Sequence, residues 1–540
     1  MTSADTPYGS GTVTADALLV KRHANSQLPI NNLPPEVLLL IFKHYMVSKR
    51  YKHYMASKQY DSCVNFEWIR VTHVCYMWRD IALSAATLWS SLRINDWTSP
   101  ERASVWLQRS QQTSLTFKAL ESWGFHASDE RIEIYGLILA QLHRIQEFDV
   151  AVPPSELRRI QWPTTPTNAL KRFNFVVRGY LKYELHEPFP FRTDVDAAFP
   201  YLESFSIKHA SLQLGVCRFP SSLTDLTLWD VGPLSAASWH SITTILHGLH
   251  SLEAVTIGRS LLDETPAPTP PPVTPVSLPR LRKLQIAEHL IPCAQLLDML
   301  AVPYGVKLSF TILVTHDTLP LLADKGKSIV SWISQVSGPW PSVAFFSWPT
   351  PDSDDDYIPS EYSFAAGEMV TLPWATETHD VFIKIEEHEQ TLFYRNPQFD
   401  LFFDLFDFRP VKKLLIAMKE QQPLLRTLFQ MTAVEDLCVE GTPFPEDYMH
   451  LLYPQPSTRS LLFPHLKSLY INCHRDRNGR DHHARKLRDM LPVRKKLGSP
   501  VERLVVSSME GYNSSVYAKI RDTNVILVEG YDGPLSYFTL

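Results

Sequence analysis

The six residues Leu202-Glu203-Ser204-Phe205-Ser206-Ile207 place apolar side chains at the first, fourth and sixth positions. Because successive side chains of a β-strand point to opposite faces, this spacing predicts a short strand that buries Phe205 and Ile207. Neighbouring copies of the pattern are mostly about 20 to 35 residues apart, which indicates a repeat architecture. The nine copies are Ile145-Phe148-Val150, Leu170-Phe173-Phe175, Leu202-Phe205-Ile207, Leu223-Leu226-Leu228, Leu252-Val255-Ile257, Leu281-Leu284-Ile286, Val434-Leu437-Val439, Leu466-Leu469-Ile471 and Val501-Leu504-Val506.

Each copy predicts a strand that is followed by a return segment. Segments such as Ser238 to Leu249 and Cys293 to Leu300 are compatible with helices, and a strand plus a helix leaves an apolar edge that only the next unit can cover. The pattern resembles the leucine-rich repeat, although the asparagine that usually follows the strand is replaced. Its places hold Ala210, Val231, Ser260, His289 and His474. We therefore expect an α/β fold in which residues 95–540 form an irregular solenoid, with parallel strands on a concave face and helices and loops outside.

The stretch from Leu308 to Met431 fits the repeat pattern poorly. Strand-like runs at Lys307 to Val314 and Val381 to Ile385 suggest divergent repeats with long insertions. The aromatic block Phe399 to Phe406 is expected to be a buried edge or helix face rather than an exposed ligand surface.

A helical module is predicted before the repeats. Prolines at Pro34 and Pro35 suit the start of a helix, whose first N–H groups lack partners, and Val37, Leu38, Ile41 and Tyr45 recur at helical spacing. A second helical stripe contains Trp68, Val71, Val74, Cys75, Trp78, Ile81 and Ala82, and is followed by Leu88-Trp89. A unit of about 60 residues buries such stripes poorly by itself, so a partner surface is expected.

This module resembles the F-box, in particular the F-box-like proteins of fungi. The resemblance covers residues 28–94, and it implies docking onto the Skp adaptor subunit of a cullin-RING ubiquitin ligase by helix-in-groove contacts. The sequence departs from the family pattern in two ways. Tyr76 and Met77 stand where the family often has basic or small polar residues, and the interval between the helices is longer than in the shortest F-boxes. The residues that the resemblance assigns to Skp binding are Leu33, Pro34, Val37 and Ile41 from the first helix and Val74, Cys75 and Trp78 from the second.

The strand positions that alternate with the buried ones are the candidates for binding a target protein. They include Ser206, Lys208, Thr227, Trp229, Thr256, Gln285, Tyr470 and Asn472. Trp229 and Tyr470 are the strongest candidates because aromatic side chains give a large contact area at a low entropic cost. The alternative is that both aromatic side chains are packed under a loop.

Composition narrows the classes of function. A net charge of −5 and a pI near 6.5 give no general attraction to nucleic acid or to an anionic membrane, and no apolar run is long enough to span a bilayer. The 6 cysteines are widely scattered, which suits free thiols in the cytoplasm or nucleus. Residues 1–27 are expected to be a disordered lead. No motif for catalysis, a cofactor or a metal is found, and Cys473, His474, His482 and His483 match no zinc spacing.

Three segments stand out by composition alone. Residues 265–277 are rich in proline and predict an extended loop, and residues 351–357 predict a solvated acidic loop. Arg475 to Arg503 is dense in Arg and Lys, but acidic residues interrupt it, so nucleic acid is not expected as a partner.

Together these features predict a non-catalytic adaptor. The helical module would dock the Skp subunit of an SCF-type ligase while the solenoid binds a target protein that the sequence does not identify. The alternative is a repeat scaffold for protein binding whose helical cap has no connection with a ligase.

Overall fold

A computed structural model describes most of the chain. The described residues are 15–56, 67–94, 98–119, 129–162, 165–177, 194–210, 212, 217–231, 236–259, 275–315, 318–338, 342–349, 359–367, 381–387, 401–417, 425–441, 452–453, 461–473, 482–507 and 526–529. They divide between two compact units, Met1–Ser206 and Ile207–Leu540, and the boundary falls inside strand β5 (Ser204–Lys208).

The first unit begins with helices. α1 (Ala15–Ser26) and the 3-10 helix η1 (Pro29–Asn32) precede α2 (Pro35–Ala56), which starts at a proline as expected. η3 (Glu67–His73), α3 (Tyr76–Ser84) and η4 (Ala86–Leu88) follow. The prediction of a disordered lead over residues 1–27 is therefore wrong for Ala15–Ser26. The Ser, Thr and Gly residues that suggested disorder stand mostly before Ala15, whereas α1 itself is rich in strong helix formers.

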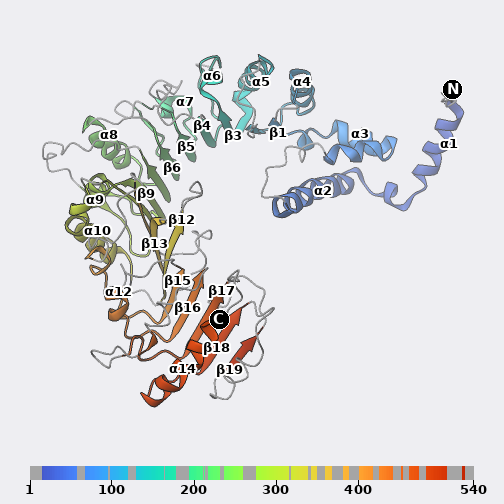
Figure 1. Cartoon of the computed structure of the whole chain (residues 1–540). Helices are drawn as coiled ribbons and strands as arrows, with labels where there is room; N and C mark the ends of the chain where they lie inside the picture. The colour runs from blue at the N-terminus through green and yellow to red at the C-terminus, as the bar shows by residue number, and fades with distance from the viewer. Residues whose placement is uncertain are drawn as a thin grey trace, which may run out of the picture. The chain divides into compact units, whose positions relative to one another are not determined.

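A parallel sheet completes the first unit. β1 (Ser91–Ile94), β2 (Leu115–Ala119), β3 (Ile145–Val152) and β4 (Arg172–Val177) pair in chain order. One side of this sheet carries the short helices, as Figure 1 shows. These are α4 (Pro100–Arg109), α5 (Asp129–Leu139), η5 (Leu142–Arg144), α6 (Pro154–Leu157) and α7 (Val195–Ala198).

The second unit continues the same alternation of strand and helix. β6 (Asp225–Trp229), β7 (Ala254–Gly258), β9 (Lys283–His289) and β11 (Lys307–Val314) pair in parallel. α8 (Ala236–His247), α9 (Leu290–Met299), η7 (Leu319–Leu321) and α10 (Leu322–Val336) connect the strands. A separate pair of two-residue strands joins β8 (Val276–Ser277) to β10 (Leu300–Ala301).

One strand of the second unit, β13 (Pro359–Gly367), runs antiparallel to both of its neighbours in the sheet. β11 pairs with β14 (Val381–Glu387), and β13 lies between β14 and β12 (Ser342–Pro349). β12 then pairs in parallel with β15 (Lys413–Ala417), so the three strands of the insertion lie in reversed order within the sheet. The expected insertion in this region is therefore a meander of three strands, two of which the sequence did not predict.

Parallel pairing resumes after the reversal. β15 is followed by β16 (Asp436–Gly441), β17 (Ser468–Cys473), β18 (Arg503–Ser507) and β19 (Ile526–Glu529). The helices α12 (Leu425–Gln430) and α14 (His482–Lys496) lie on the same side of this sheet as α8, α9 and α10 (Figure 1).

The nine predicted copies coincide with nine parallel strands. Every apolar residue of the pattern whose burial is described lies in the core. β15 contains a tenth copy of the pattern, which was not predicted. Its apolar residues Val411, Leu414 and Ile416 are also buried. The aromatic block is buried as expected, through Phe402, Phe403 and Phe406. A Cβ at Gly326 of α10 would lie 2.6 Å from the Phe402 ring.

The backbone at the strand ends explains how neighbouring repeats are linked without the usual asparagine. His209, Asp230 and Arg259, each directly after a strand, have φ values of 58°, 52° and 49°. Each donates its backbone N–H to a carbonyl of the next strand, namely those of Trp229, Gly258 and Ala287, at 2.7 to 2.8 Å. At the asparagine position, Ala210 and Val231 are fully buried, so the main-chain turn rather than a polar side chain links neighbouring repeats.

Several predictions from composition concern residues that are only partly described. The proline-rich loop 265–277 lies outside the described residues up to 274, and its last two residues form β8. The acidic loop 351–357 lies outside the described residues, as do the side chains of Cys473, His474, His482 and His483. Within the described residues, no helix combines the length and the apolar character that crossing a bilayer requires.

Candidate functional site

The helical module exposes apolar side chains along its outer side. Leu40 of α2 is 64 % exposed, Val74 before α3 is 58 % exposed, and Val37 and Ile41 are exposed on the same helix as Leu40. Leu38 and Phe42, four residues apart on the opposite side of α2, are fully buried. The module thus uses one side of α2 for its own core and leaves the other side without cover from the described chain.

Contacts between α2 and α3 decide which side faces inward. The rings of Phe42 and Trp78 lie 5.0 Å apart, and Trp78 Nε1 donates to Asn31 Oδ1 at 2.7 Å. The sequence grouped Val37, Leu38 and Ile41 in one apolar stripe, whereas in the structure Leu38 is buried and Val37 and Ile41 are exposed. A continuous apolar run from Val37 to Phe42 carries no helical period, so only the packing against Trp78 selects the buried side.

All seven residues predicted to bind the Skp subunit remain accessible in the structure. Pro34, Val37, Ile41 and Val74 are exposed, and Leu33, Cys75 and Trp78 are half-buried. None is sealed against the rest of the described chain, which is the arrangement that a docking surface needs. Leu40 and Tyr76, which the sequence did not single out for binding, are also exposed in this module. Leu40 belongs to the apolar run of α2 and Tyr76 begins α3, and these positions could have indicated both residues.

Three tryptophans join the helical module to the first sheet. Trp68 of η3, Trp89 after η4 and Trp106 of α4 form edge-to-face contacts with ring centroids 4.8 to 5.9 Å apart, and all three are buried. Trp89 Nε1 donates to the carbonyl of Ala82 at 2.9 Å, and the Arg109 guanidinium lies 4.5 Å from the Trp89 ring. The cluster fixes α3 and α4 to each other and to the start of β1.

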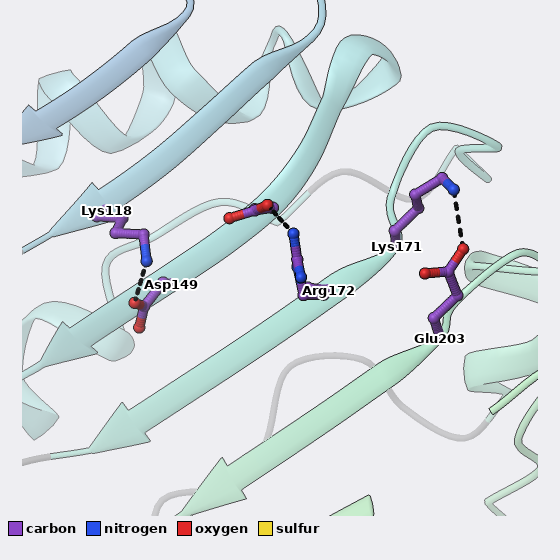
Figure 2. A network of polar contacts seen from close by, with 6 residues as sticks. Lys118, Asp149, Lys171, Arg172 and Glu203 are labelled. Carbon is purple, nitrogen blue, oxygen red and sulfur yellow. Dashed lines mark hydrogen bonds and ion pairs between the residues drawn. The ribbon is translucent and has the colours of Figure 1, made fainter. Parts of the chain in front are cut away.

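The sheet of the first unit presents charged side chains on the face that carries no helices. Figure 2 shows three ion pairs here, two between neighbouring strands and one between residues directly before β4 and β5. Lys118 pairs with Asp149 at 3.4 Å, Arg172 pairs with Glu147, and Lys171 pairs with Glu203 at 2.8 Å. In the same row, Asn174 donates to Asp149 at 2.7 Å, and Arg93 stands opposite Lys118. Burial lowers the pKa of Arg93, and the Asp149 carboxylate opposes this shift.

These pairs satisfy one another, which limits what the face can bind. Exposed ion pairs contribute little to stability, so their main effect here is to balance charge across the strands. A ligand would have to break a pair in order to use either partner. Among the described residues, this face of the first unit is therefore a polar surface on which the charges of these six side chains are balanced in pairs.

The target-binding candidates of the second unit are accessible in different degrees. Lys208, Trp229, Gln285 and Tyr470 are half-buried, and the side chain of Asn472 lies outside the described side chains. The Trp229 ring covers the neighbouring strand at Gly258, where an added Cβ would lie 2.4 Å from the ring. Gly258 is thus the position that lets Trp229 lie flat on the sheet.

Tyr470 lies in a less open environment than predicted. The residues opposite it on β16 and β18 are Cys438 and Val505, and both are buried. Burial raises the pKa of the Tyr470 phenol, and the Arg503 guanidinium lies 5.8 Å from its ring. Tyr470 is thus half-buried between two buried neighbours, and its role as a target contact stays a prediction.

The basic stretch near the C-terminal end contains a buried arginine that the sequence did not reveal. Arg494 of α14 is fully buried and donates to the carbonyls of Leu452, Leu462 and Phe463 and to the hydroxyl of Ser499, at 2.5 to 3.2 Å. Burial lowers the pKa of its guanidinium to about 10. This side chain holds loop carbonyls together, and its burial removes it from any surface that could attract nucleic acid.

A comparison with known families identifies the helical module. The family model described as F-box-like matches residues 30–95, which span η1 to β1. The chain thus has an N-terminal F-box-like domain followed by a mixed α/β body with a parallel sheet. No curated protein matches the chain.

Proposed function

We propose that this chain is a substrate-recognition adaptor of an SCF-type cullin-RING ubiquitin ligase. The observation that carries the proposal is the F-box-like match over a module whose outer side leaves Val37, Leu40, Ile41 and Val74 exposed. Exposed apolar groups on a helix are the anchors of helix-in-groove recognition, and burial of a few such anchors supplies most of the binding energy of an interface. The partner for this surface would be the Skp subunit.

The α/β body would hold the target protein. We propose that it is an irregular leucine-rich-repeat-like solenoid of the kind found with F-box-like modules in fungi, because its strands are parallel and its return helices lie on one side. Trp229, spread over Gly258, is the best-supported contact residue, and Lys208 and Gln285 occupy other half-buried strand positions of the second unit. The chain would contribute proximity between target and ligase rather than a catalytic group.

We place the adaptor in the cytoplasm or nucleus. Six widely scattered cysteines suit a reducing compartment, and Cys75 and Cys293 are thiols without a disulfide in the described part of the chain. Imaging of the tagged full chain tests this placement, and accumulation in a secretory compartment would contradict it.

Binding of the full chain to a purified Skp subunit tests the docking proposal. The double variant Val37→Asp/Ile41→Asp places two charges on the proposed contact surface, where each anchor is worth about 2 kcal/mol or more. Affinity should fall by two orders of magnitude or more, since about 1.4 kcal/mol corresponds to tenfold. Val105→Asp on α4 is the matched control, because Val105 is equally exposed, at 42 %, but lies outside the F-box-like match.

The choice of these positions avoids confounding effects on folding. Trp78 is half-buried, packs on Phe42 and donates to Asn31, so its replacement would also disturb the module itself. Val37 and Ile41 are exposed and can be changed with less effect on the core. Equal Skp affinity of the double variant and the wild type, or no binding by either, would contradict the proposal.

A second experiment separates the adaptor from a repeat scaffold without a ligase. Proximity labelling with the wild type and with Val37→Asp/Ile41→Asp should recover the same target proteins, but only the wild type should recover Skp and cullin subunits. Those targets should be ubiquitylated by the reconstituted ligase with the wild type alone. Target recovery without any ligase subunit would instead favour the scaffold.

A further inference from the structure

The first helix of the chain is short and almost uncovered. Leu19 is 59 % exposed and Val20 is 68 % exposed, and the side chains from Lys21 to Ala24 are exposed as well. A helix of 12 residues is marginally stable in water without packing. α1 therefore combines apolar exposure with a need for stabilising contacts that the described chain supplies only at its C-terminal end.

Those contacts place the end of α1 beside the start of α3. The Arg22 guanidinium lies 4.4 Å from the centre of the Tyr76 ring. Asn31 Nδ2 donates to the carbonyl of Asn25 at 2.7 Å, while Asn31 Oδ1 accepts from Trp78 Nε1 at 2.7 Å. Asn31 thus ties the C-terminal end of α1 to the same tryptophan that holds α3 on α2.

The position of Tyr76 connects α1 with the proposed docking surface. Tyr76 is 60 % exposed and follows Val74 and Cys75, two of the residues predicted to bind the Skp subunit. It is also one of the two positions at which the sequence departs from the F-box pattern. The Arg22 guanidinium of α1 lies over the Tyr76 ring. The unusual residue of the F-box-like module is therefore the one that contacts α1.

We propose that α1 is an N-terminal extension of the Skp-docking surface, in which Leu19 and Val20 contact the Skp subunit next to Val74 and Tyr76. This inference rests on the proposed function and adds residues that precede the F-box-like match at residues 30–95. Continuity favours the Skp subunit as the occupant, since a partner that covers Val74 and Tyr76 meets Arg22 of α1 directly. Lys21 and Arg22 also favour acidic side chains at the edge of the partner surface.

The test measures the affinity of the full chain for a purified Skp subunit. Leu19→Ala/Val20→Ala removes the apolar side chains but keeps the helix, because alanine has the highest helix propensity. We expect an affinity loss of about tenfold, given the apolar area that would no longer be buried. Val105→Ala, which also truncates an exposed apolar residue on a helix, should bind like the wild type.

Hydrogen exchange gives an independent readout. Amides of residues 15–26 should exchange more slowly when the Skp subunit is added to the wild type, and this protection should weaken in Leu19→Ala/Val20→Ala. Unchanged exchange in this segment on addition of the Skp subunit would overturn the inference.

The outcomes distinguish this inference from the proposed function. If Val37→Asp/Ile41→Asp loses Skp binding while Leu19→Ala/Val20→Ala retains wild-type affinity, the docking proposal stands and the role of α1 is refuted. If the wild type does not bind the Skp subunit, both fail. If the wild type alone is a dimer that Leu19→Ala/Val20→Ala converts to a monomer, a second copy covers α1, and the inference is likewise refuted.

Discussion

Replacement of Trp89 by alanine should loosen the junction between the helical module and the first sheet. Trp89 is only 2 % exposed and lies between the rings of Trp68 and Trp106, at 4.9 and 4.8 Å. Truncation of such a side chain leaves a cavity and costs about 3 to 5 kcal/mol. Trp89→Phe keeps most of the ring but leaves the Ala82 carbonyl without its donor, so a loss of about 1 to 3 kcal/mol is expected.

The assay should report the local stability of the junction. A chain of two compact units need not unfold in one step, and its 13 tryptophans obscure the fluorescence of any single one. Hydrogen exchange of the amides in α3 and α4 measures the free energy of local opening directly. Both helices should show the loss, because the cluster connects them.

Val105→Ala on α4 is the control, since this exposed side chain should cost less than about 0.5 kcal/mol. A change below about 1 kcal/mol in Trp89→Ala would refute the reasoning. So would a loss that is confined to α3, because the tryptophan cluster would then not connect the helical module to α4.

Other substitutions test the packing described above. Gly258→Ala should displace the Trp229 ring and destabilise the protein by about 1 to 3 kcal/mol in chemical denaturation, whereas Gly136→Ala, with open space around it in α5, should be neutral or stabilising. Arg494→Met should cost about 3 kcal/mol or more by the same measurement, because it removes the donor of three buried carbonyls. Arg494→Lys should cost less. Equal stability of the wild type and both variants would contradict this role of Arg494. Asn31→Leu should speed hydrogen exchange in α1 without unfolding the sheet, and unchanged exchange would show that the side chain does not hold the helix.

The repeat strands could be predicted because their signal is local and periodic. Leu202, Phe205 and Ile207 are buried, and so are the residues at the equivalent positions of the other copies whose burial is described. The alternation of a strand, with a period of two, can be recognised in only six residues. The reversed order of β12, β13 and β14 could not be predicted in this way, because strand pairing there depends on residues far apart in the sequence.

The position of the docking module could be predicted from the sequence, but the contact that selects the buried side of α2 could not. The prolines and the two stripes located the helices, yet the side of α2 that faces inward depends on Phe42 meeting Trp78. Arg494 was missed for a different reason. Charged residues are rarely buried without partners, and its carbonyl partners on distant loops leave no trace in the local sequence.

The main-chain links at the ends of β5, β6 and β7 make each of these three repeats depend on the one after it. His209, Asp230 and Arg259 each need a carbonyl from the next strand, and that carbonyl always comes from the same place in the repeat. If a gene rearrangement removed one complete repeat, the following one would present an equivalent acceptor and the donor would be satisfied. Loss of part of a repeat would leave the amide without this acceptor. Proteins built in this way can therefore change length during evolution in whole repeats, and their number of strands can vary more freely than the shape of each one.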